Sequence, residues 1–326
     1  MPVITRTSPP SRSAPEPVWR TVVAPRSLRR TLGVYRVGFH DPTTRIEPGR
    51  FRRATLTPDG PATLQLTWTA DPAPVGADGL DAEAWGPGAT WLLDRVGALT
   101  GADDEPVELV APAEHDQPVD AALRATRTHR LGRSGTLYHE LLPTIIGQRI
   151  TGGEALRQWH RLTLELGETA PGPSDVADEL RLPPAPETLY RRPTWWFHPL
   201  GIEDKRARAL TEVARHPRKL FEWADLTSAD VAAKLALIPG VGPWTIGTVQ
   251  VSALGDVDAV IVGDYHFPNT VAWALAGEAR GDDDRMLALL EPYRGQRGRV
   301  LQALVRTVGA APKFGPRQRI LPMSKW

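Results

Sequence analysis

The sequence contains no cysteine among its 326 residues. Disulfide bridges, thiolate zinc sites and cysteine-bound iron–sulfur clusters are therefore excluded. It also lacks any apolar run near 18 uncharged residues, about the length that a membrane-spanning helix needs. The N-terminal segment bears Arg and Pro where a secretory signal has an apolar core. These absences predict a cytoplasmic protein with no membrane partner.

Basic residues are scarce in one region, although the whole chain has a formal charge of only +1. Residues 71–120 hold twelve acidic side chains and a single basic one, Arg95. The rest of the chain is therefore basic, and its bases are mostly arginine, whose planar fork binds phosphate bidentately. This distribution favours a nucleic-acid partner. A codon-composition bias would produce the same excess of arginine.

Composition and periodicity divide the chain into four parts. Residues 1–30, with six Arg and six Pro, predict a flexible arm. Residues 31–120 predict a small α+β domain, with alternating segments at 33–39, 51–57 and 62–69, a loop at 71–88 and a helix near 90–99. Residues 121–310 are helical, and residues 311–326 form a basic tail. The predicted fold class is mainly α, with a small antiparallel sheet domain before the helices.

Apolar residues recur at helical spacing from residue 137 onward. Thr151 and Glu154 form a capping-box pattern at the start of one helix. Further helices are predicted near 203–215, 228–236, 243–254, 266–276, 284–290 and 296–308.

The most specific local signal is the string Leu-Ile-Pro-Gly-Val-Gly-Pro-Trp-Thr over residues 237–245, between two predicted helices. Gly240 and Gly242 permit positive φ and close backbone approach. Pro243 suits the first position of a helix. The N–H groups and positive dipole end of that helix would bind a phosphate without a charged side chain. A bare Gly-x-Gly is more often an ordinary turn, but the full string favours phosphate binding.

This hairpin is followed some 20 residues later by Gly263-Asp264-Tyr265. The pair resembles the helix-hairpin-helix superfamily of DNA glycosylases, most of all its 3-methyladenine glycosylase II (AlkA-type) branch. The segments 142–151, which includes Gln148, and 291–294, Glu-Pro-Tyr-Arg, resemble two further family motifs. The resemblance covers roughly 121–310. It implies a helix-hairpin-helix glycosylase domain there and damaged double-stranded DNA as partner.

The resemblance also implies roles for single residues. Asp264 would be the catalytic carboxylate, and aromatic side chains would wall the pocket for a flipped base: Trp244 first, then Tyr265 and Trp196, with Trp195 also a candidate. The tryptophans at 195 and 196 could equally belong to a domain core. DNA contacts would come from Gln148, Arg149, Gly240, Val241, Gly242 and Thr245. No side-chain metal site is expected, but the backbone of Leu237 and Gly242 could hold a sodium or potassium ion.

Departures from the family pattern refine the prediction. Relatives that also cleave the DNA backbone have Lys where this chain has Trp244, so no Schiff base with the sugar can form there. A monofunctional enzyme without a cofactor is therefore expected. Arg149 follows Gln148 where some relatives have an apolar wedge, and Thr248 stands where the AlkA type has a pocket aromatic. These two positions leave the wedge residue and the substrate range open.

The chemistry of base excision agrees with a carboxylate at Asp264. Breaking an N-glycosidic bond builds positive charge on the sugar, which a fixed anion stabilises. By residue type alone, however, Asp at a helix start is more often a cap. An alkylated purine already carries positive charge and needs no acid to leave, so base excision repair of 3-methyladenine or 7-methylguanine is predicted. A non-catalytic lesion-binding protein and a glycosylase for another base, such as uracil, remain the alternatives. A monomer associated with the bacterial nucleoid is expected by default.

Overall fold

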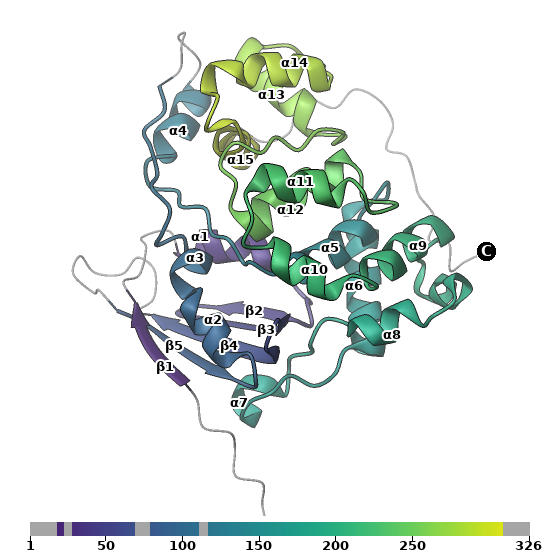
Figure 1. Ribbon diagram of the computed structural model, residues 1–326. Helices are drawn as coiled ribbons and strands as arrows, with labels where there is room; N and C mark the ends of the chain where they lie inside the picture. The colour runs from purple at the N-terminus through teal and green to yellow at the C-terminus, as the bar shows by residue number, and fades with distance from the viewer. Residues whose placement is uncertain (1–17, 23–27, 69–78, 111–116, 309–326) are drawn as a thin grey trace, which may run out of the picture.

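The computed structural model describes residues 18–22, 28–68, 79–110 and 117–308. They form a small sheet with short helices, followed by two groups of helices (Figure 1). This architecture confirms the predicted fold class. The predicted basic tail at 311–326 and much of the predicted arm lie outside the described residues. Within the described ranges, no helix combines the length and apolar character that crossing a bilayer requires.

The sheet has five antiparallel strands in the order β1-β5-β4-β3-β2. The strands are β1 (Val18–Val22), β2 (Thr44–Glu47), β3 (Arg50–Thr57), β4 (Gly60–Trp68) and β5 (Leu80–Trp85). The alternating segments at 51–57 and 62–69 lie in β3 and β4, which pair with Thr57 opposite Gly60 across a tight turn.

Three predictions in this domain were wrong. Residues 33–39 are not a strand: Gly33–Tyr35 forms a 3-10 helix, η1, and a turn follows. Leu80–Trp85, predicted as loop, is strand β5, whose core side chains include two small alanines that gave a weak periodic signal. The arm predicted at 1–30 contains β1, which pairs with β5. In the last two cases a distant strand supplies the partner, which local sequence does not reveal.

Each face of the sheet is covered by a different part of the chain. Three short helices, α1 (Leu28–Leu32), α2 (Ala89–Asp94) and α3 (Val96–Thr100), share an apolar core with one face. The helix predicted near 90–99 is therefore two helices, which meet at Arg95. On the other face, Ala54 packs with residues of the 170–182 segment, which includes α7 (Ser174–Ala177). The sheet is thus buried on both sides.

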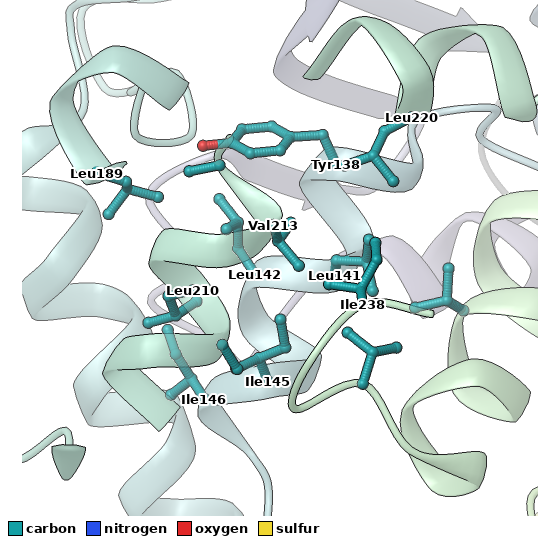
Figure 2. Packing of buried hydrophobic residues seen from close by; sticks show 14 of the residues in the cluster. Tyr138, Leu141, Leu142, Ile145, Ile146, Leu189, Leu210, Val213, Leu220 and Ile238 are labelled. Atoms are coloured by element: carbon teal, nitrogen blue, oxygen red, sulfur yellow. The ribbon is translucent and has the colours of Figure 1, made fainter. Parts of the chain in front are cut away.

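The first helical group surrounds α5 (Leu137–Ile146), in which all residues except Pro143 are buried. Figure 2 shows the apolar side chains of α5 meeting those of its neighbours. These neighbours are α6 (Gly152–Leu166), α8 (Pro186–Tyr190), α9 (Asp204–Val213), α10 (Pro217–Trp223), α11 (Ser228–Leu235) and α12 (Pro243–Leu254). The capping box is confirmed in part, because the Thr151 hydroxyl accepts a hydrogen bond from the Glu154 N–H.

The second helical group has a separate apolar core. It contains α4 (Gln117–Ala125), α13 (Phe267–Ala276), α14 (Asp283–Leu290) and α15 (Arg297–Thr307). The segment from α12 to α13 therefore crosses from one core to the other. Asp264 lies on this crossing segment, at the junction of the two groups.

A buried polar network joins the sheet to the first helical group. Arg53 on β3 donates to the Glu140 carboxylate on α5 at 2.6 Å and contacts His139 Nδ1 at 3.1 Å. Asp41 accepts the Trp159 indole N–H of α6 at 3.0 Å. Burial, with Arg53 adding to it, holds the pKa of His139 well below its usual value, so this imidazole is neutral. The network orients α5, which leads directly to Gln148.

Candidate active site

The α11–α12 hairpin carries the string singled out in the sequence. Gly240 has φ +86°, and a Cβ there would lie 2.6 Å from the Cβ of Ala209 on α9. The predicted need for glycine is therefore confirmed at this position. Gly242 differs, because its φ is −103° and nothing lies within 4 Å of where a Cβ would be. Gly240 seats the hairpin on α9, while Gly242 leaves open space at the start of α12.

The start of α12 has the features of an anion site. Gly242 is its N-cap and Pro243 its first residue, as predicted. The first turn contains no acidic residue, and no side chain caps it. The positive end of the helix dipole is therefore not neutralised by the cap or first turn. A phosphate group is the complementary ligand.

Two residues predicted to contact DNA have buried side chains. Val241 is 5% exposed, and its N–H donates to the Ile238 carbonyl within the hairpin. Thr245 is 1% exposed, and its hydroxyl accepts from Gln148. Burial of both side chains leaves the backbone of Val241 and Thr245 as the part that could contact DNA, and their predicted role stays a prediction. Both residues lie on the face of the hairpin that packs on the helical core.

Gln148 ties the loop after α5 to the hairpin. Its Nε2 donates to the Gly240 carbonyl and to the Thr245 hydroxyl, both at 2.9 Å. The next residue, Arg149, is exposed and has φ +57°, the one positive φ of a non-glycine residue in the described ranges. A left-handed residue of this kind costs about 1–2 kcal/mol, and such strain clusters at functional sites. The Gln148 anchor and the Thr151 cap hold Arg149 in this conformation.

Sequence reasoning missed Arg206, which supports the same loop from below. Its guanidinium is buried and donates to the Ile146 carbonyl at 2.6 Å and to Gln158 Oε1 at 2.7 Å. It thereby caps the C-terminal end of α5, just before Gln148. One signal was available: Arg206 lies next to Ala207 on the apolar face of α9, where a charged residue is unusual.

Both carboxylate oxygens of Asp264 have defined partners. Oδ1 accepts the backbone N–H groups of His266 at 2.7 Å and Phe267 at 3.0 Å, at the start of α13. Oδ2 accepts the indole N–H of Trp244 at 3.0 Å. Asp264 thus binds the N–H groups of the N-cap His266 and of the first residue of α13, and at the same time contacts the hairpin helix α12. The capping and catalytic interpretations of this residue are compatible.

Trp244 on the hairpin helix α12 connects the α5–α6 loop to Asp264. It is the second residue of α12, and the far edge of its ring lies 3.6 Å from where a Cβ on Gly147 would be. Its N–H bonds Asp264 on the opposite side. The half-buried indole therefore spans from the α5–α6 loop to the carboxylate.

Two acidic residues outside the predicted site hold the crossing segment. Asp283 on α14 accepts the N–H of Gly263 at 2.8 Å, next to the candidate catalytic residue. Asp258 accepts from the Arg297 guanidinium and from the Gly295 N–H. Burial opposes ionisation of Asp258, but its bonds to Arg297 prevail and lower its pKa. Neither role could be predicted from the sequence, because each pair of partners is separated by at least one helix.

The other predicted pocket residues are placed differently. Tyr265 is 82% exposed, with its ring edge-on to His266 at 5.0 Å. Trp196 lies on the 3-10 helix η2 (Thr194–Leu200) and packs against the core of the first helical group. Its ring neighbours are Phe197 and Arg192, which agrees with the core interpretation. The Thr248 hydroxyl donates to the Trp244 carbonyl at 2.8 Å.

A cation at the hairpin stays a prediction. The Gly242 carbonyl accepts the Ile246 N–H within α12, and Leu237 is 81% exposed at the hairpin. Among the residues placed by the structure, no group of three or more His, Asp or Glu side chains could hold a metal ion.

No protein-family model and no curated protein matches the chain. Among solved structures, the 3-methyladenine DNA-glycosylase from Archaeoglobus fulgidus aligns with a TM-score of 0.66 at 16% identity, over 90% of this chain and 99% of that one. The 8-oxoguanine glycosylase/lyase of Clostridium acetobutylicum in its apo form aligns with a TM-score of 0.58 at 12% identity, over 90% and 99%. Its complex with double-stranded DNA that pairs cytosine with 8-oxoG aligns at 0.53 and 13%, over 82% and 89%.

These likenesses extend over nearly the whole length of both chains, so the sheet and both helical groups are shared. At this level of identity they establish the fold. The protein has the fold of the helix-hairpin-helix DNA glycosylases, as the hairpin and Asp264 predicted.

Proposed function

We propose that this protein is a monofunctional DNA glycosylase that flips an alkylated base out of damaged duplex DNA and hydrolyses its N-glycosidic bond. The observation that carries the proposal is the placement of Asp264. Its carboxylate lies between the uncapped start of α12 and the start of α13, with both oxygens oriented by hydrogen bonds.

The geometry suits stabilisation of a cationic sugar. As the bond between C1′ and the base nitrogen breaks, the electron pair leaves with the base and positive charge develops on the sugar ring. The Asp264 anion would stabilise that charge, and a water oxygen would then bond to C1′ while its proton passes to the carboxylate or to solvent. The Trp244 N–H and two backbone N–H groups hold the carboxylate in place, so it need not reorganise during the reaction.

The remaining contacts with DNA follow from the same framework. The open start of α12 at Gly242 would take a backbone phosphate, and the strained, exposed Arg149 would reach the gap left by the flipped nucleotide. Flipping costs a few kcal/mol, which these contacts must offset.

A cationic alkylated base is the preferred substrate class for two reasons. Such a base leaves as a neutral molecule, so no side chain has to protonate it. The half-buried indole of Trp244 beside Asp264 also offers an electron-rich face to a cation. A uracil glycosylase is the alternative among enzymes, and a non-catalytic lesion binder is the alternative outside them.

The decisive experiment compares wild type with Asp264→Asn on methylated duplex DNA, with chromatography of the released bases. Asparagine keeps an oxygen for the N–H groups of His266 and Phe267, so folding can be checked by an unchanged melting temperature. We expect release of 3-methyladenine or 7-methylguanine by wild type alone. Release of uracil only from a uracil-containing duplex would reassign the substrate. Absence of any release, with intact DNA binding, would favour the lesion binder.

The absence of lyase activity needs its own test, since the Clostridium acetobutylicum structures are of a glycosylase/lyase. Borohydride reduces a Schiff base to a stable covalent complex with DNA. Because Trp244 offers no amine, we expect no trapped complex while base release proceeds. A trapped complex would show that an amine elsewhere in the chain reaches the sugar.

A further inference from the structure

The exposed tryptophan at position 195 is not accounted for by the core or by the site at Asp264. Trp195 is 66% exposed, whereas its neighbour Phe197 is fully buried. Exposure of a ring of this size removes the core explanation for this residue, and an exposed aromatic side chain commonly marks a contact surface.

The segment that presents Trp195 is held rigidly. Trp196 packs edge-on against Phe197 at 5.2 Å, and the Arg192 guanidinium lies 4.7 Å from the Trp196 ring centre. At its end, the Gly201 carbonyl accepts Gln158 Nε2 at 2.7 Å and Arg206 at 3.3 Å. The backbone that carries Trp195 is thus held before any partner binds, which lowers the entropy cost of a contact.

Helix α9 connects the segment that carries Trp195 to the hairpin. The α11–α12 loop, α9 and α8 lie toward one side of the molecule in Figure 1, and η2 follows α8 and leads into α9. Ala209 lies beneath Gly240, and Lys205 is about 6 Å away along the helix at about 1.5 Å per residue. That distance spans about two nucleotides of one DNA strand at about 3.4 Å each.

The charge of this surface favours an anionic partner. Arg208 pairs with Asp204 at 2.7 Å and Arg206 pairs with Glu203 at 3.6 Å, so these four largely cancel. The bases left over are Arg191, Arg192 and Lys205, against the single acid Glu187.

We propose that Trp195 and its flanking bases form a second DNA contact, which binds the duplex beside the lesion after the hairpin has engaged its phosphate. We call Trp195, Arg191, Arg192 and Lys205 the flank contact. Trp195 packs on a deoxyribose of the backbone, and the arginines and Lys205 take phosphates. This inference rests on the proposed function for its partner, but it concerns affinity and not the chemical step.

The test measures dissociation constants for a fluorescent duplex with a stable abasic-site analogue and for the same duplex undamaged. We expect Trp195→Ala to weaken binding to both by about tenfold, as for loss of one aromatic stacking contact. Trp195→Phe should retain most of the affinity. Arg191→Ala should lower the slope of log affinity against log salt by about one.

The matched control is Phe39→Ala. Phe39 is 76% exposed and has Arg36 at 5.7 Å over its ring, but it lies on the loop before β2. Shortening one flank of the duplex should weaken DNA binding by wild type and leave the affinity of Trp195→Ala unchanged. The single-turnover rate of base release at saturating enzyme should be the same for wild type and Trp195→Ala.

Wild-type affinity in Trp195→Ala, or an equal loss in Phe39→Ala, would overturn the flank contact. Its fate is separable from that of the proposed function. Loss of affinity in Trp195→Ala without base release by any variant would support the surface and reject the enzyme. Base release by wild type together with normal DNA binding by Trp195→Ala would support the enzyme and reject the flank contact. No DNA binding by wild type would reject both.

Discussion

Replacing Trp244 by Phe isolates the hydrogen bond that orients the candidate catalytic carboxylate. Phenylalanine keeps an aromatic ring between Gly147 and Asp264 but has no N–H. Asp264 Oδ2 then loses its 3.0 Å partner, while Oδ1 keeps both backbone donors. The carboxylate is therefore expected to stay near its position but to rotate more freely.

The size of the effect follows from the strength of that bond. A hydrogen bond to an ionised group contributes about 1.5–3 kcal/mol. Because Trp244 is half-exposed, we take the lower value, about 1.5 kcal/mol, which corresponds to about a tenfold lower rate. The assay is single-turnover release of the methylated base at saturating enzyme, with Trp273→Phe on α13 as the control for exchanging one aromatic ring for another. A Trp244→Phe rate equal to wild type would refute the argument that the indole N–H positions Asp264.

Three further predictions concern the framework around the site. Gly240→Ala should lower the free energy of unfolding by about 2 kcal/mol and weaken DNA binding, since φ is +86° and the new methyl would clash with α9. Gly242→Ala should change the free energy of unfolding far less, because φ is −103° and the space is open; equal melting temperatures for the two variants would contradict this difference. Arg53→Met should lower the free energy of unfolding, measured by urea denaturation, by about 3–5 kcal/mol because it leaves the buried Glu140 carboxylate unpaired. Adding Glu140→Leu should recover part of this loss. Additive effects of the two substitutions would count against a coupled pair. Burial, assisted by nearby arginines, lowers the pKa of His129 from 6.5 to about 3, so below pH 6.5 the unfolded chain binds a proton that the folded chain does not bind. The free energy of unfolding should therefore fall by about 1.4 kcal/mol per pH unit from pH 6.5 downward. His129→Gln should flatten this slope by that amount, and an unchanged slope would argue against a neutral buried imidazole.

The hairpin and the catalytic candidate could be predicted because their signals are local. Gly240 and Pro243 have backbone preferences that act within one or two residues, and these preferences alone place a turn and a helix start. Asp264 was singled out because the hairpin and the spacing of about 20 residues that follows it resemble a known family pattern. Helical periodicity likewise located most helices to within a few residues.

The sheet edges and the supporting contacts could not be predicted in this way. Strands β1 and β5 are short and weakly periodic, and each is stabilised by pairing with the other across some 60 residues. Arg206 and Asp283 act on backbone groups that lie far away in the sequence. No local pattern encodes such a partner, because the contact exists only once both elements have packed.

Taken alone, the sequence determined the turn and helix start of the hairpin and most of the helical content, since both depend on residue preferences at short range. Its resemblance to a known family singled out Asp264 as the candidate catalytic carboxylate. The tertiary structure decided which predicted contacts are accessible. Packing of the hairpin on the core buried Val241 and Thr245, turned Gln148 into a clamp and left Arg149 and Trp195 facing outward. The physical reason is that burial depends on the sum of contacts from several elements, whereas backbone preference depends on one residue and its neighbours.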